Sequence, residues 1–122
     1  MPVVIDDDAF EQLVTEALDQ IPVELAQHME NVVILIEDRP SPAQQRGYRG
    51  MLLGLYQGVA LTKRGPLSYH NTMPDRITIF KEPHCRITRS EAALRKRVAQ
   101  TVIHEVGHHF GIGDARLREL GW

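Results

Sequence analysis

The sequence predicts a small α+β protein. Apolar residues recur at helical spacing near both ends of the chain, over residues 8–21 and again between Ser90 and Gly111. Between these regions, the β-branched segments 32–36 and 77–80 are typical of strands. A chain of 122 residues has room for one hydrophobic core, so we expect a single domain over residues 1–122.

The first helix is expected over residues 8–21. Its apolar positions share one face: Phe10, Leu13, Val14, Ala17, Leu18 and Ile21. The aspartates at positions 6–8 suit the positive end of a helix dipole. Pro22 ends this helix and is well placed in the first turn of a short second one that includes Val23, Leu25 and Met29.

Three strands and one loop are expected in the middle of the chain. The continuous apolar run Val32–Ile36 predicts a central strand covered on both faces. A second strand is indicated around Leu52–Tyr56, and a third at Ile77–Phe80, which Glu82 and Pro83 follow. The polar segment 63–74 predicts a surface loop, whose Tyr69, His70 and Asn71 could line a site.

The longest predicted helix lies near the C-terminus. Ser90 is a good N-cap, and no residue breaks the helical pattern before Gly111. At about 100° per residue, Val102, Ile103, Val106 and Phe110 fall on one side of this helix. His104 and His108 point elsewhere, which leaves them free for chemistry.

The composition excludes several classes of protein. The chain has 14 Lys and Arg against 16 Asp and Glu, so its net charge of -2 argues against nucleic-acid binding. No apolar run approaches the roughly 20 residues that cross a bilayer, and the first residues lack the pattern of a secretory signal. The lone Cys85 agrees with a reducing compartment. We therefore expect a cytoplasmic protein that binds neither nucleic acid nor membrane.

The segment His104-Glu105-Val106-Gly107-His108 carries the chemistry. It places two imidazoles one helical turn apart, where both can bind one Zn²⁺ ion. Gly111 lets the chain leave the helix sharply, so that the Asp114 carboxylate can return to the same ion. A water molecule at the open fourth position has its pKa lowered toward ~7, and Glu105 can take its proton. This pattern predicts peptide hydrolysis.

The string TVIHEVGHHFGIGD resembles the extended zincin motif His-Glu-x-x-His-x-x-Gly-x-x-Asp. Together with LLGLYQG at 52–58, PDRITIFKEP at 74–83 and the terminal ELGW, it is similar to the small bacterial zincin-like metallopeptidase domains. The resemblance implies a minimal zincin-like fold with a small mixed sheet packed on helices, a bound zinc ion, and a peptide or protein substrate. It also implies an edge strand above the active-site helix that pairs with extended substrate. Ile77–Phe80 is our candidate for that strand.

The sequence departs from larger metzincins in two respects. Only 8 residues follow Asp114, and they contain no methionine turn. They also contain no Tyr or His to steady an oxyanion, a role that is therefore vacant or falls to the 63–74 loop.

Several alternatives stay open at this stage. Glu119 competes with Asp114 as the third ligand. His109 points about 100° away from His108, which favours a place behind the ligands or at the surface over coordination. His84 and Cys85 are adjacent rather than at ligand spacing, so a second metal site there is disfavoured. The main rival function is a non-catalytic zinc module that binds a partner strand, and the oligomeric state is unknown.

Overall fold

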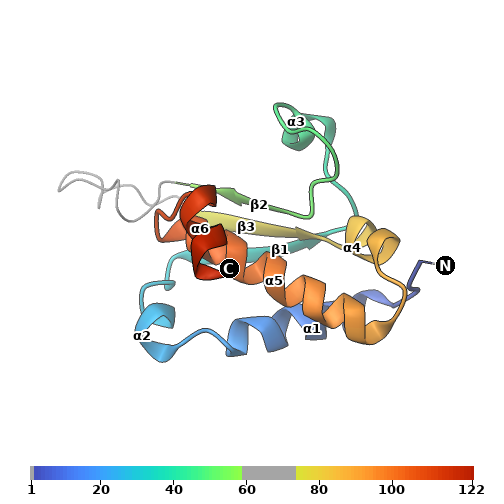
Figure 1. Cartoon of the computed structure of the whole chain (residues 1–122), viewed down its shortest axis with the longest axis horizontal. Helices are drawn as coiled ribbons and strands as arrows, with labels where there is room; N and C mark the ends of the chain where they lie inside the picture. The colour runs from blue at the N-terminus through green and yellow to red at the C-terminus, as the bar shows by residue number, and fades with distance from the viewer. Residues whose placement is uncertain (1, 59–73) are drawn as a thin grey trace.

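The computed structural model describes residues 2–58 and 74–122. Two long helices, α1 (Asp7–Asp19) and α5 (Glu91–His109), lie together on one side of a small sheet (Figure 1). The strands are β1 (Val32–Glu37), β2 (Gly54–Gln57) and β3 (Asp75–Phe80). The short helices are α2 (Val23–Ala26), α3 (Pro42–Gln45), α4 (Lys81–Ile87) and α6 (Asp114–Leu120). The predicted α+β class and the long helix near the C-terminus are confirmed.

The sheet is mixed, with strand order β1-β3-β2. Strand β1 pairs in parallel with β3, whereas β2 pairs with β3 in the antiparallel direction. The prediction that Val32–Ile36 is the central strand is therefore wrong, because β1 is at an edge. Burial explains the difference: Ile77, Thr78 and Ile79 in β3 are almost completely buried, whereas Val33 in β1 is 38% exposed. A continuous apolar run alone does not distinguish a strand covered on both faces from one at an edge.

The choice of Ile77–Phe80 as the edge strand is also wrong. The edge strand that contacts α5 is β2, and the two elements approach closely at Gly54. A Cβ atom at Gly54 would lie 2.8 Å from Thr101 Cγ2 and 3.1 Å from Glu105 Cγ. The absence of a side chain at this position therefore lets the strand lie directly against the helix.

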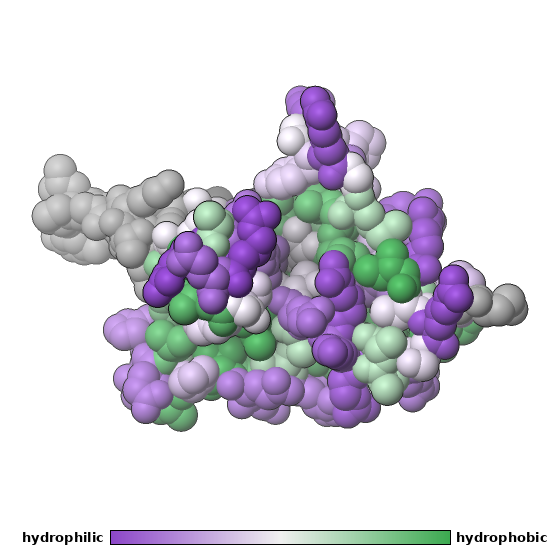
Figure 2. All heavy atoms as spheres, in the orientation of Figure 1, coloured by the Kyte–Doolittle hydropathy of each residue, from purple (hydrophilic) through white to green (hydrophobic). Residues whose placement is uncertain are grey.

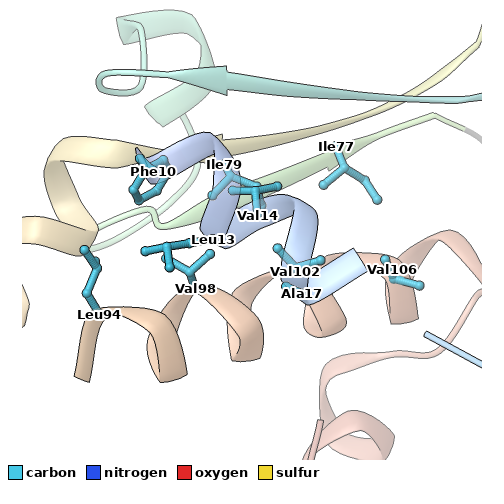
Figure 3. Close-up of a cluster of buried hydrophobic side chains, with 10 residues drawn as sticks. All are labelled: Phe10, Leu13, Val14, Ala17, Ile77, Ile79, Leu94, Val98, Val102 and Val106. Carbon is cyan, nitrogen blue, oxygen red and sulfur yellow. The ribbon is translucent and has the colours of Figure 1, made fainter. Parts of the chain in front are cut away.

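The core lies between α1, α5 and the sheet (Figure 3). Phe10 and Val14 of α1 meet Val98 and Val102 of α5 beneath β3. Asp6 caps α1, which begins at Asp7, one residue before the predicted start. The predicted cap of α5 is confirmed, since the Ser90 side chain accepts a hydrogen bond from the Ala93 backbone N–H. This packing fixes α5, the helix that carries the candidate site.

Three short helices were not predicted. Helix α3 begins with a capping box between Ser41 and Gln44, a signal that the sequence does contain. Helix α4 follows β3 directly, and α6 begins at Asp114. Helix α5 ends at His109, two residues before the expected break at Gly111. Tyr69, His70 and Asn71, which were expected to line a site, lie outside the described residues.

Candidate metal centre

The last two turns of α5 bring the two motif histidines together. The rings of His104 and His108 meet edge to face, with their centroids 4.8 Å apart. One potential ligand atom from each of His104, Glu105 and His108 lies within 4.8 Å of the others. Helix geometry alone brings the two histidines together, because residues i and i+4 share a face.

The end of α5 turns the chain back toward these histidines. Gly111 has φ 81°, a left-handed conformation that favours glycine. The Gly111 N–H donates to the His108 carbonyl at 2.9 Å, and the Ile112 N–H donates to the Gly107 carbonyl at 3.0 Å. These two bonds form a Schellman motif, so the turn predicted at Gly111 is a defined C-cap.

The same turn orients the His108 ring. Its Nδ1 lies 3.1 Å from the Ile112 carbonyl oxygen, an acceptor to which the ring N–H donates. The other ring nitrogen, Nε2, faces Asp114. A second partner of this kind commonly fixes the tautomer of a metal-binding histidine.

Helix α6 packs on α5 through Gly107. A Cβ atom at Gly107 would lie 2.3 Å from Cδ2 of Leu117, whose side chain is fully buried. The glycine within the motif therefore makes room for Leu117. This contact sets α6 against α5 and places Asp114, the first residue of α6, beside the histidines.

Asp114 Oδ1 lies 3.2 Å from His104 Nε2 and 3.1 Å from His108 Nε2. Ligand atoms about 2.0–2.1 Å from a tetrahedral zinc ion lie roughly 3.3 Å from one another. The two distances from Asp114 Oδ1 to the imidazole nitrogens therefore match the spacing between ligands of one zinc ion. The Asp114 side chain is 69% exposed, so the cluster opens to solvent on that side.

Glu105 lies beneath the histidines and is only 8% exposed. Burial raises the pKa of its carboxyl above the ordinary value, and nearby Asp114 raises it further. His108, His104 and a hydrogen bond from the Tyr56 backbone N–H act in the opposite direction. The carboxylate is thus held by β2 and buried beside the group that could bind a metal.

A cleft of about 980 Å³ contains the cluster. Its walls come from β2 and the segment before it, from the exposed side of α5, and from the C-terminal segment including Trp122. Figure 2 shows a hollow in this face between the α3 segment and α6. A second cavity of about 720 Å³ lies near α2 and Trp122, but its described lining contains no His, Cys, Asp or Glu. The first cleft is therefore the candidate site.

The other candidate residues have different roles. Glu119 lies 2.8 Å from Arg116 and is not part of the described cluster. His84 is fully buried, with its ring nitrogens near the Phe80 carbonyl and the Thr101 hydroxyl, and Cys85 beside it is free and partly buried. His109 is also buried, at 2% exposure, so the surface alternative for it is wrong.

The sequence reasoning did not identify Tyr56 and Asp75, which contact one another and His109 near the site. Neither residue belongs to a spacing pattern with the histidines. Only the pairing of β2 with β3, and the packing of both against α5, brings them there.

The sequence model of the zincin-like metallopeptidase family matches residues 29–122. The chain belongs to this family. Membership in the zincin-like family implies a metal, typically zinc, and the His104-Glu105-His108 group is one that could bind it. The resemblance inferred from the motif is thereby confirmed.

The zincin-like domain also resembles a solved structure, that of a conserved hypothetical protein from Thermus thermophilus. The two chains superpose with a TM-score of 0.55 at 21% sequence identity, over 95% of this chain and 97% of the other. This likeness concerns the fold. No curated protein matches the sequence closely enough to count as a relative. Among the described residues, no helix is long and apolar enough to span a membrane.

Proposed function

We propose that this zincin-like domain is a zinc-dependent peptidase in which His104, His108 and Asp114 hold the metal and Glu105 is the general base. The observation that carries the proposal is the convergence of Asp114 Oδ1 on both histidine Nε2 atoms, at 3.2 Å and 3.1 Å. Family membership supports the reaction class.

When bound, a zinc ion supplies Lewis acidity, which makes water more acidic and polarises a peptide carbonyl. Three protein ligands also leave a position open for chemistry, whereas a purely structural zinc site is closed by four. The exposure of Asp114 supports access to such a position from the solvent side of the cleft.

Glu105 is suited to accept and return a proton. It is buried beside His104 and His108, and its side chain packs against β2 at Gly54. Its raised pKa brings it nearer to neutrality, where a general acid–base group is most effective. Its burial and its place in the motif both support the role of base.

The substrate is a peptide or protein segment bound in extended form along β2. This strand is a sheet edge beside the cleft, and a substrate could pair with it through main-chain hydrogen bonds. Such pairing supplies affinity with little dependence on sequence.

The test is the substitution Glu105→Gln, which keeps the shape of the side chain but removes the base. We expect the variant to fold and retain zinc, while cleavage of the best substrate found in a peptide library falls by about 10²–10⁴. Glu119→Gln is the matched control, because the Glu119 carboxylate pairs with Arg116, whereas Asp114 lies against both histidines. It should cleave like the wild type.

Equal cleavage by wild type and Glu105→Gln would remove Glu105 as the base. No cleavage by the zinc-loaded wild type across a broad library would favour a non-catalytic zinc module that binds a partner strand.

A further inference from the structure

A buried polar chain lies directly behind the candidate metal centre. The Tyr56 hydroxyl donates to Asp75 Oδ2 at 2.7 Å, and the same oxygen lies 2.8 Å from His109 Nδ1. The other ring nitrogen of His109 lies 3.2 Å from the His28 carbonyl oxygen. This Tyr56–Asp75–His109 chain joins β2, β3 and the end of α5.

The Tyr56–Asp75–His109 group is closely packed inside the protein. Asp75 is 3% exposed and His109 is 2% exposed, so each depends on its polar partners for stability. Gly58 makes room for the carboxylate, because a Cβ atom there would lie 2.4 Å from Asp75 Oδ1. The rings of Tyr56 and His109 also meet edge to face, with centroids 5.9 Å apart. These contacts hold the three side chains in one arrangement.

Tyr56 connects this chain to Glu105. Its side chain is held by Asp75, and its strand packs directly against Glu105, since a Cβ atom at Gly54 would lie 3.1 Å from Glu105 Cγ. Glu105 and His109 are one turn apart on the same helix. The contacts therefore form a closed ring, from Glu105 through α5 to His109, on to Asp75 and Tyr56, and back to Glu105.

We propose that Tyr56, Asp75 and His109 are positioning residues that hold the Glu105 carboxylate in place for proton transfer. The proposal rests on the role of Glu105 in the proposed function. None of the three needs to touch substrate, since they act by holding β2 against α5 at Glu105. Both ring nitrogens of His109 already face acceptors, which accounts for this histidine without a role as a metal ligand.

The most direct measurement is hydrogen exchange of the backbone amide of residue 56 by NMR. Tyr56→Phe removes the hydroxyl and keeps the ring, while Asp75→Asn keeps the size of the side chain. Losing one buried hydrogen bond corresponds to about a tenfold change in a local equilibrium. We expect exchange at residue 56 to accelerate by about tenfold in both variants.

Thr88→Val is the matched control. Thr88 is also buried, and its hydroxyl donates to the His84 backbone carbonyl at 2.8 Å. This hydrogen bond does not involve Tyr56, Asp75, His109 or Glu105. The substitution removes one buried hydrogen bond and leaves the contacts around Glu105 unchanged. Exchange at residue 56 in this variant should stay within about twofold of the wild-type rate.

With a substrate in hand, Tyr56→Phe should lower kcat by about tenfold and leave KM and zinc content unchanged. The exchange measurement requires neither zinc nor substrate, so it separates this inference from the proposed function. Faster exchange at residue 56 in Tyr56→Phe and Asp75→Asn, but not in Thr88→Val, supports the positioning role even if no peptidase activity is found. If the residue 56 amide of Tyr56→Phe exchanges at the wild-type rate, the positioning role is wrong. The result for Tyr56→Phe alone is decisive if Asp75→Asn does not fold.

Discussion

At the residue scale, Asp114 depends most on its surroundings. It is one of seven aspartates in the chain, and its carboxylate reaches both histidines only because the α5 C-cap and the Gly107 contact place it there. Glu119 is five residues further along the same helix and lies beside Arg116 instead. The two carboxylates therefore provide a direct comparison.

We predict that the wild type binds about one zinc ion per chain and that Asp114→Ala binds it more weakly. Because the folded state holds the ion, the variant should also lose most of the increase in melting temperature that zinc produces. Metal analysis and thermal denaturation with and without a chelator measure both effects. Glu119→Ala should behave as the wild type. Loss of zinc by Glu119→Ala with retention by Asp114→Ala would show that the third ligand is Glu119.

At the element scale, the contact between α5 and α6 determines whether the site is complete. Gly107 is where the two helices touch, through the buried side chain of Leu117. The motif leaves position 107 open, and in this protein a glycine at that position makes room for Leu117.

Gly107→Ala should destabilise the protein by about 1–3 kcal/mol, because the added methyl group overpacks the contact with Leu117. Zinc affinity should fall as well, since α6 carries Asp114. Gly113→Ala is the control: Gly113 has φ -77°, and a Cβ atom there meets nothing within 4 Å. Denaturant unfolding and zinc titration of both variants test this. If the two variants lose equal stability and affinity, the α5–α6 contact does not support the site.

At the scale of the whole molecule, His84 links the strand β3 and helix α4 to α5. Its Nδ1 lies 2.6 Å from the Phe80 carbonyl and its Nε2 lies 2.8 Å from the Thr101 hydroxyl. Burial lowers the pKa of His84 to about 4, with Arg97 acting in the same direction and the Phe80 carbonyl opposing it. The folded state therefore holds this ring neutral.

Because the folded-state pKa lies below that of the unfolded chain, near 6.5, the unfolded state binds the extra proton first as pH falls. The contribution of His84 to stability is complete above about pH 6.5 and declines toward pH 4, by roughly 3 kcal/mol in all. His84→Gln should show a correspondingly weaker loss of stability over this range in denaturant unfolding. An NMR titration of His84 in the wild type checks the same point, and a pKa near 6.5 would contradict the prediction.

Much of this protein could be read from its sequence because the relevant signals are local. Helix periodicity located α1 and α5, Ser90 marked a helix start, and i,i+4 spacing alone brought His104 and His108 together. The cytoplasmic location and the single-domain organisation also came from composition and length, and they stay predictions.

What the sequence could not determine depends on contacts between distant segments. The apolar run of β1 resembles a central strand, yet the pairing of distant segments makes β3 central and leaves β1 and β2 at the two edges. The sequence determined the ligand types and their spacing on one helix. Only the tertiary structure decided that the Asp114 carboxylate lies within 3.2 Å of both histidine rings and that Tyr56, Asp75 and His109 lie behind Glu105, because those positions depend on packing across the fold rather than on neighbours in the chain.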